Sequence, residues 1–146
     1  MPGRESLIAV SREWLLKADN DLTNAAHTLK LGPSCPTDTV CFHAQQCVEK
    51  YLKAMLVLEG IDFPRTHDLE TLLSLIPAEA RPDLSNEEQA RLTEYATGAR
   101  YPGWEEISLA AARRAVAVAR RVRTAIRRGL PKEVLRRSNL QRGHRS

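Results

Sequence analysis

One stretch of the sequence, residues 38–60, constrains the fold more than any other. Its apolar side chains recur at three- and four-residue spacing, which predicts a helix. They occupy more than one face, and a helix of this kind needs several neighbouring helices to bury it. The apolar positions are Val40, Cys41, Ala44, Cys47, Val48, Tyr51, Leu52, Met55, Leu56 and Leu58. The rest of the chain must therefore supply helices that surround this one.

A narrow polar strip remains on the same helix. It consists of His43, Gln46, Lys50 and Lys53. Two ammonium groups about one helical turn apart can bracket a phosphate. The strip is therefore a candidate floor for an anion or nucleotide site. The alternative is an ordinary solvated face, with Glu49 and Glu59 as partners along the helix.

The remaining sequence predicts further helices separated by proline and glycine breaks. Ser11 is the expected N-cap of a first helix, and Ser85 with Glu88 forms a capping box for a fourth. A short helix is expected over residues 68–76 and a last one over 108–129. No segment alternates as a strand does. We therefore expect an all-α fold, an up-and-down antiparallel bundle of four long helices and one short helix, over residues 11–130. Residues 131–146 are expected to form a basic, disordered tail, with or without a short helical turn at its start.

The net charge of +4 is unevenly distributed. From Arg113 onward lie 12 of the 22 Lys and Arg residues and one acid, Glu133. The last helix repeats an arginine doublet every seven residues, about two turns. The doublets are Arg113 and Arg114, Arg120 and Arg121, and Arg127 and Arg128. They are candidates for contact with an RNA or DNA backbone. The alternative is that they pair with acids of this protein or of an acidic partner.

Several classes of protein are not expected from this sequence. It has no apolar run long enough to cross a membrane and no visible secretory signal. Cys35, Cys41 and Cys47 are odd in number, which favours buried free thiols in a reducing cytoplasm. We find no phosphate-binding glycine loop, no metal-ligand spacing and no nucleophile elbow. We therefore expect a cytoplasmic protein without a cofactor or bound metal.

Two loops carry further candidate residues. His67, with Arg65 beside it, is a candidate phosphate ligand and a candidate acid–base group. It can equally cap the short helix. Arg100 and Tyr101 precede Pro102, where Arg can grip a phosphate and Tyr can stack on a base. Alternatively, Arg100 pairs with acids of the fourth helix and Tyr101 packs over the bundle end.

The ordered motifs HAQQ, EKYLKA, THDL and RYP, from His43 to Pro102, resemble those of the HEPN domain family. The resemblance covers roughly residues 14–130. It implies a helical bundle, usually a homodimer, associated with nucleotide binding. Stand-alone proteins of this kind resemble partners of minimal nucleotidyltransferases in toxin–antitoxin-like operons of bacteria and archaea.

The RNA-cleaving members of that family carry an Arg followed, after four to six residues, by a His at the dimer interface. Within the expected bundle no histidine has this spacing. Arg137 precedes His144 suitably, but in the tail. We therefore expect a nucleotide-binding, dimeric partner of a minimal nucleotidyltransferase without catalysis of its own. A metal-independent endoribonuclease using His67 and Arg100 is one alternative. A nucleic-acid binder using the arginine doublets is another.

Overall fold

The computed structural model of the chain describes residues 3–99 and 101–136. These residues contain helices and no strand, so the expected all-α class is confirmed. The four long helices are α1 (Arg4–Leu29), α2 (Thr37–Leu58), α4 (Asn86–Thr97) and α5 (Leu109–Gly129). The short ones are α3 (Leu69–Leu75) and α6 (Lys132–Leu135), and single 3₁₀ turns occupy Gly32–Ser34 and Ala78–Ala80.

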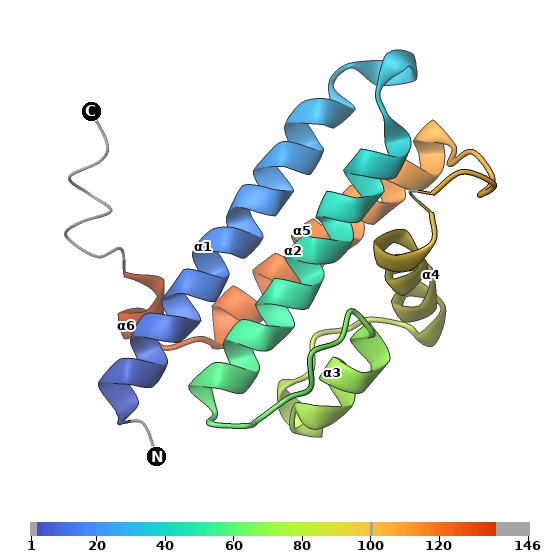
Figure 1. Cartoon of the computed structure of the whole chain (residues 1–146). Helices are drawn as coiled ribbons and strands as arrows, with labels where there is room; N and C mark the ends of the chain where they lie inside the picture. Colours follow the sequence, from blue (N-terminus) through green and yellow to red (C-terminus); the bar gives the residue numbers. More distant parts are fainter. Residues whose placement is uncertain (1–2, 100, 137–146) are drawn as a thin grey trace, which may run out of the picture.

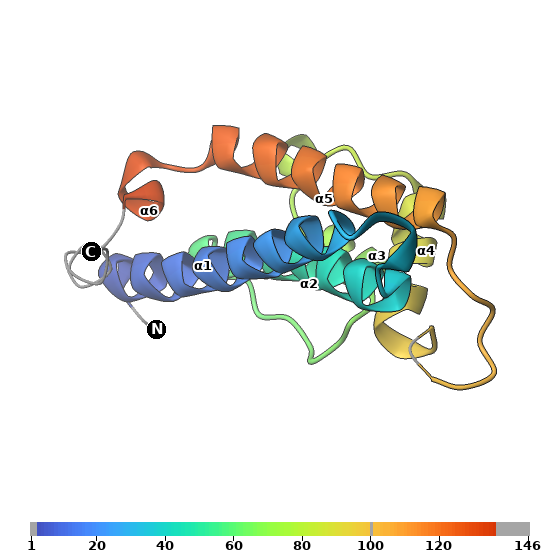
Figure 2. The ribbon, with the colours of Figure 1, turned by 90° about the horizontal axis from the view of Figure 1, so that it is seen from above.

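Helix α2 lies at the centre of the bundle, as its apolar surface predicts. It runs antiparallel to α1 along most of its length (Figure 1) and also contacts α3, α4 and α5. Seen from above, α5 lies alongside α1 and α2, while α3 and α4 lie on another side of α2 (Figure 2). Four neighbours around one helix leave it little exposed surface.

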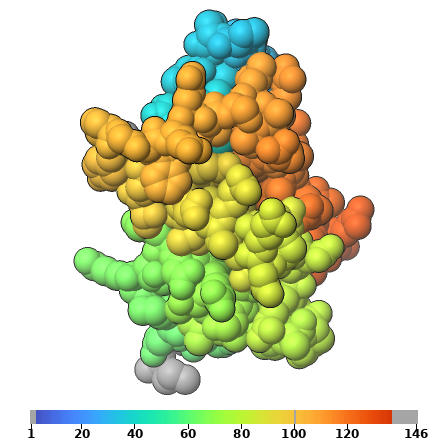
Figure 3. Space-filling view, turned by 90° about the vertical axis from the view of Figure 1, so that its right-hand side faces the viewer, coloured from blue at the N-terminus to red at the C-terminus, as the bar shows by residue number. Residues whose placement is uncertain are grey.

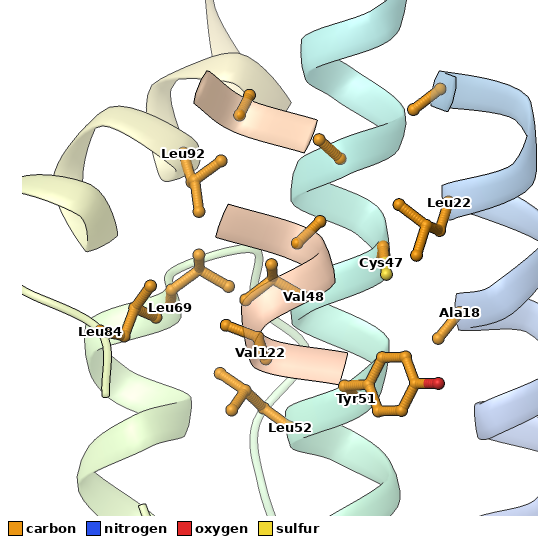
Figure 4. Close-up of a cluster of buried hydrophobic side chains, with 14 of the residues drawn as sticks. Ala18, Leu22, Cys47, Val48, Tyr51, Leu52, Leu69, Leu84, Leu92 and Val122 are labelled. Carbon is orange, nitrogen blue, oxygen red and sulfur yellow. The ribbon is translucent and has the colours of Figure 1, made fainter. Parts of the chain in front are cut away.

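The core forms where these helices meet on α2. Tyr51, Leu52 and Leu56 are fully buried, and Figure 4 shows Val48 and Leu52 of α2 grouped with Val122 of α5 and Leu69 of α3. The face of α5 toward the core is rich in alanine. Its buried residues are Ala111, Ala112, Ala115, Val116, Ala119, Val122 and Ile126. These small side chains let the backbone of α5 approach that of α2 closely.

Most predicted helix ends are confirmed. Ser85 and Glu88 form the capping box at the start of α4. Gly60, at φ 69°, ends α2, and the amide of Ile61 donates to the carbonyl of Leu56 at 2.9 Å. This pattern satisfies carbonyl groups that a helix end otherwise leaves unpaired.

The expected cap at Ser11 is wrong, because α1 begins at Arg4. Ser11 is buried within α1, where its hydroxyl donates to the carbonyl of Ala54 in α2 at 2.8 Å. Thr37, the first residue of α2, likewise donates its hydroxyl to a carbonyl far along the chain, that of Ile107, at 2.7 Å. Serine and threonine serve as caps or as interhelical donors, and sequence alone does not separate the two roles.

Helix α6 is a short helical turn at the start of the segment expected to form the basic tail. Val134 is 1% exposed and α6 packs on α1. Arg12 of α1 donates to the carbonyl of Glu133. The bundle therefore extends to α6. Residues 137–146, including Arg137 and His144, lie outside the described residues.

Candidate functional site

The polar strip of α2 faces a carboxylate of α1. His43 Nδ1 lies 3.0 Å from Oδ1 of Asp21, and Lys50 Nζ lies 2.6 Å from Oδ2. The side chain of Asp21 is 11% exposed, against 27% for His43 and 22% for Lys50. One largely buried carboxylate thus orients two basic groups that still reach the surface. Asp21 is buried because α2 packs over that side of α1.

A second carboxylate, Glu49, organises the rest of the strip. It is 3% exposed. Its Oε1 lies 2.7 Å from His67 Nδ1 and accepts from Gln45 Nε2 at 3.1 Å. Gln45 also donates to the carbonyl of His67 at 3.1 Å. The loop that carries His67 is therefore fixed to α2 through both a side chain and the backbone.

Lys53 is, like Gln46, a buried member of the strip. It is 8% exposed, and its Nζ lies 3.0 Å from Oε2 of Glu49. The same ammonium group lies 5.4 Å from the ring centroid of Trp14 and 5.7 Å from that of Phe63. Aromatic faces attract a cation and here they also cover it. Lys53 is therefore placed to hold Glu49 and the loop, rather than to form an open phosphate site.

These residues form one surface, which we call the α2 polar face. It consists of His43, Gln45, Gln46, Glu49, Lys50 and Lys53 of α2, with Asp21 and His67. The side chain of His67 is 56% exposed, and its Nδ1 is engaged by Glu49. Its Nε2 is therefore the ring atom left for a ligand. Arg65, two residues earlier, is exposed in the same loop.

Tyr101 lies at a different place. With Trp104 it lines a hollow beside Thr37 and Asp38, at the N-terminal end of α2. Lys50 lies 13 residues beyond Thr37, or about 20 Å along a helix axis. Within one chain, Tyr101 therefore lies far from Lys50. Arg100 itself lies outside the described residues.

The loop that carries Tyr101 is largely exposed, so packing over the bundle end is limited. Tyr101 is 63% exposed and Trp104 is 42% exposed. Figure 3 shows this segment, in orange, beside the blue α1–α2 connection. Trp104 rests on Gly98, where an added Cβ would come within 2.9 Å of its ring. Gly98 therefore allows the loop to fold back against α4.

The arginine doublets of α5 do not form one uniform ridge. Arg121 donates to Oε1 of Glu88 at 2.6 Å and to the carbonyl of Asp83 at 3.1 Å. Arg127 lies 3.6 Å from Asp19. Arg113, Arg114, Arg120 and Arg128 are exposed. The predicted pairing with acids of this protein therefore holds for two of the six.

Asp19 organises a third polar cluster, between α1 and α5. It accepts a hydrogen bond from the hydroxyl of Tyr51, and its Oδ1 lies 2.9 Å from Arg123 Nε. Burial and this bond to Asp19 raise the pKa of Tyr51. Asp19 and Asp21 are two residues apart on α1, so they point to opposite flanks of the α1–α2 contact.

Comparison with known proteins identifies the fold family. A family model described as the HEPN domain matches residues 11–129. The chain belongs to the HEPN domain family. Its structure is similar to the crystal structure of TT1696 from Thermus thermophilus, with a TM-score of 0.67 and 25% sequence identity. That likeness covers 82% of this chain and 98% of that chain. Among curated proteins, no match was found.

The HEPN domain described here has no helix long and apolar enough to cross a membrane within residues 3–99 and 101–136. The same residues contain no group of three or more His, Cys, Asp or Glu side chains arranged to hold a metal ion.

Sequence reasoning identified the basic members of the α2 polar face and, in the alternative of a solvated face, Glu49 as a partner along the helix. It missed Asp21 of α1 and the contact between Glu49 and His67. One signal was available, because polar residues in a helix otherwise buried on several sides require partners across the contact. Finding those partners needs the register between α1 and α2, which spacing along one helix does not supply.

The three cysteines are free and buried, as predicted. Burial raises the pKa of the Cys41 thiol from 9.0 to about 12. The folded state therefore keeps a proton that the unfolded state releases above pH 9, and stability should fall between about pH 9 and pH 12. We expect Cys41→Ala to reduce this alkaline loss by at most about 1.4 kcal/mol per pH unit. Urea unfolding at about pH 8 and about pH 10.5, on either side of the ordinary thiol pKa, would measure the loss of unfolding free energy in each protein. Equal losses in the wild-type protein and in Cys41→Ala would contradict the prediction.

Proposed function

We propose that this HEPN domain binds the phosphate of a nucleotide on the α2 polar face. In this proposal it acts as the dimeric partner of a minimal nucleotidyltransferase in a toxin–antitoxin-like pair in the cytoplasm, without catalysis of its own. One observation carries the binding site. His43, Lys50 and His67 all reach the surface, and each is held by a largely buried carboxylate.

The carboxylates preorganise the site for a ligand. Binding loses less conformational entropy when the donor side chains are already oriented. Asp21 and Glu49 orient the donors but also cancel the charge of Lys50 and Lys53, so the face is not strongly positive. This favours recognition of one phosphate by directed hydrogen bonds over general attraction of a polyanion.

Nucleotide binding is testable by thermal shift. A ligand at ten times its dissociation constant stabilises a protein by about 1.4 kcal/mol, or about 4 °C for a chain of this size. We expect ATP to raise the Tm of the wild-type protein by about this amount. Lys50→Ala should lose the shift, whereas Lys17→Ala, which removes an exposed lysine of α1, should keep it. No shift in the wild-type protein, or an equal loss in both variants, would contradict the site.

The partnership rests on family membership together with an exposed surface. Tyr101 and Trp104 are exposed aromatic residues beside Glu105 and Glu106, and aromatic residues are enriched at protein interfaces. Co-expression with a nucleotidyltransferase encoded beside this chain would test it. We expect the two proteins to co-elute with two HEPN chains per complex by light scattering. Separate elution would contradict the partnership without affecting the nucleotide test.

Endoribonuclease activity is the second candidate. It is favoured by His67, because a ring held at Nδ1 by a carboxylate presents Nε2 as a base. Incubation with RNA in EDTA separates the two candidates. Under our proposal the wild-type protein leaves the RNA intact. Cleavage that disappears in the His67→Ala, Arg100→Ala double variant would replace that proposal with the nuclease.

A further inference from the structure

A groove between α1 and α5 is separate from the α2 polar face. Its volume is about 460 Å³, and it is lined by Asp19, Leu22, Thr23, Arg120, Arg123 and Thr124. Figure 2 shows the two helices that form its walls running side by side. Because Asp19 and Asp21 lie on opposite flanks of the α1–α2 contact, the groove and the polar face open on different sides of α1.

Arg123 is held in place at the edge of this groove. Its Nε lies 2.9 Å from Oδ1 of Asp19, and the hydroxyl of Tyr51 also contacts the guanidinium. Asp19 is also approached by Arg127 at 3.6 Å and by the hydroxyl of Tyr51. One carboxylate therefore faces two guanidinium groups and a hydroxyl donor. The cluster carries more positive charge than negative charge.

Arg120 adds a second guanidinium one helical turn before Arg123. It is exposed and makes no ion pair with any of the residues that the structure describes. Thr23 and Thr124 line the same groove with hydroxyl groups. A fixed guanidinium, a second one within reach and hydroxyl donors on both walls match the several oxygens of a tetrahedral oxyanion.

We propose that the α1–α5 groove binds a phosphate group through Arg120 and Arg123. The groove is open and larger than a phosphate, so the rest of a nucleotide or a nucleic-acid backbone can extend from it. Arg113, seven residues before Arg120, lies on the same flank of α5 and would extend the track by about 10 Å. Arg121, which pairs with Glu88, is not part of it.

Fluorescence anisotropy with a short single-stranded RNA of about 12 nucleotides, within the length that single-strand binding sites span, tests this proposal. The RNA is labelled at its 3′ end and lacks a 5′ phosphate, and AMP serves as competitor and as a separate ligand. Arg120→Ala should weaken RNA binding about fivefold or more and lower the salt slope by about one. Arg123→Lys keeps a charge beside Asp19 but removes the paired amines, and should weaken binding similarly. Arg114→Ala, an exposed arginine on another side of α5, is the matched control and should bind normally.

The RNA and AMP arms distinguish a nucleic-acid backbone from a free nucleotide as the source of the bound phosphate. RNA binding that depends on Arg120 indicates a backbone phosphate, and AMP binding that depends on Arg120 but not Lys50 indicates a free nucleotide. The groove is rejected if neither ligand binds, if Arg114→Ala weakens binding as much as Arg120→Ala, or if polyglutamate competes as well as RNA. It is also rejected if Arg120→Ala and Arg123→Lys, folded by circular dichroism, bind both ligands normally. The α2 polar face has its own test, the thermal shift with ATP and Lys50→Ala, so the groove can fail while that test succeeds.

Discussion

Replacing Glu49 with alanine is expected to lower the free energy of unfolding by about 3–5 kcal/mol. The side chains of Glu49 and Lys53 are 4% and 11% exposed, so the substitution leaves a buried ammonium group without its carboxylate. It also releases Gln45 and the Nδ1 of His67. Urea unfolding followed by circular dichroism would measure the loss.

A double variant separates the cost of the unpaired charge from the cost of lost packing. Glu49→Leu with Lys53→Met removes both charges and keeps similar volumes, so its stability should lie much closer to that of the wild-type protein. If Glu49→Ala costs less than about 1 kcal/mol, the buried carboxylate does not hold the network, and the assigned role of Lys53 fails with it.

Leu52→Ala is expected to cost about 2–5 kcal/mol. Leu52 is fully buried on α2, close to Val122 of α5 (Figure 4), and its truncation opens a cavity that helices on several sides cannot all move to fill. Leu16→Ala is the matched control, since Leu16 is 43% exposed on α1, and it should change stability by less than about 0.5 kcal/mol. Similar losses in the two variants would contradict the central place of α2.

The fold was largely predictable because its signals are local. The apolar positions of residues 38–60, the capping box at Ser85 and the stop at Gly60 all act within a few residues, and each has the predicted structure. Ser11 was misassigned because its real partner, the carbonyl of Ala54, is 43 residues away. Local patterns cannot distinguish an interhelical donor from a cap.

The candidate site was less predictable because its side chains have partners that are distant in the sequence. The basic residues of α2 were visible as a strip, but which of them reach solvent depends on partners from other elements. Trp14 and Phe63 cover Lys53, whereas Asp21 holds Lys50 at the surface. Arg123 was not singled out at all, since its position in the α1–α5 groove depends on Asp19, 104 residues earlier.

The most direct test of the central claim is a nitrogen-15 NMR titration of the histidine rings with ATP. His43 and His67 belong to the α2 polar face, whereas His27 is exposed on α1 away from these contacts and serves as an internal control. We predict that ATP shifts the ring resonances of His43 and His67 and leaves those of His27 in place. Unchanged resonances of His43 and His67 at millimolar ATP, or equal shifts of all three histidines, would contradict nucleotide binding on the α2 polar face.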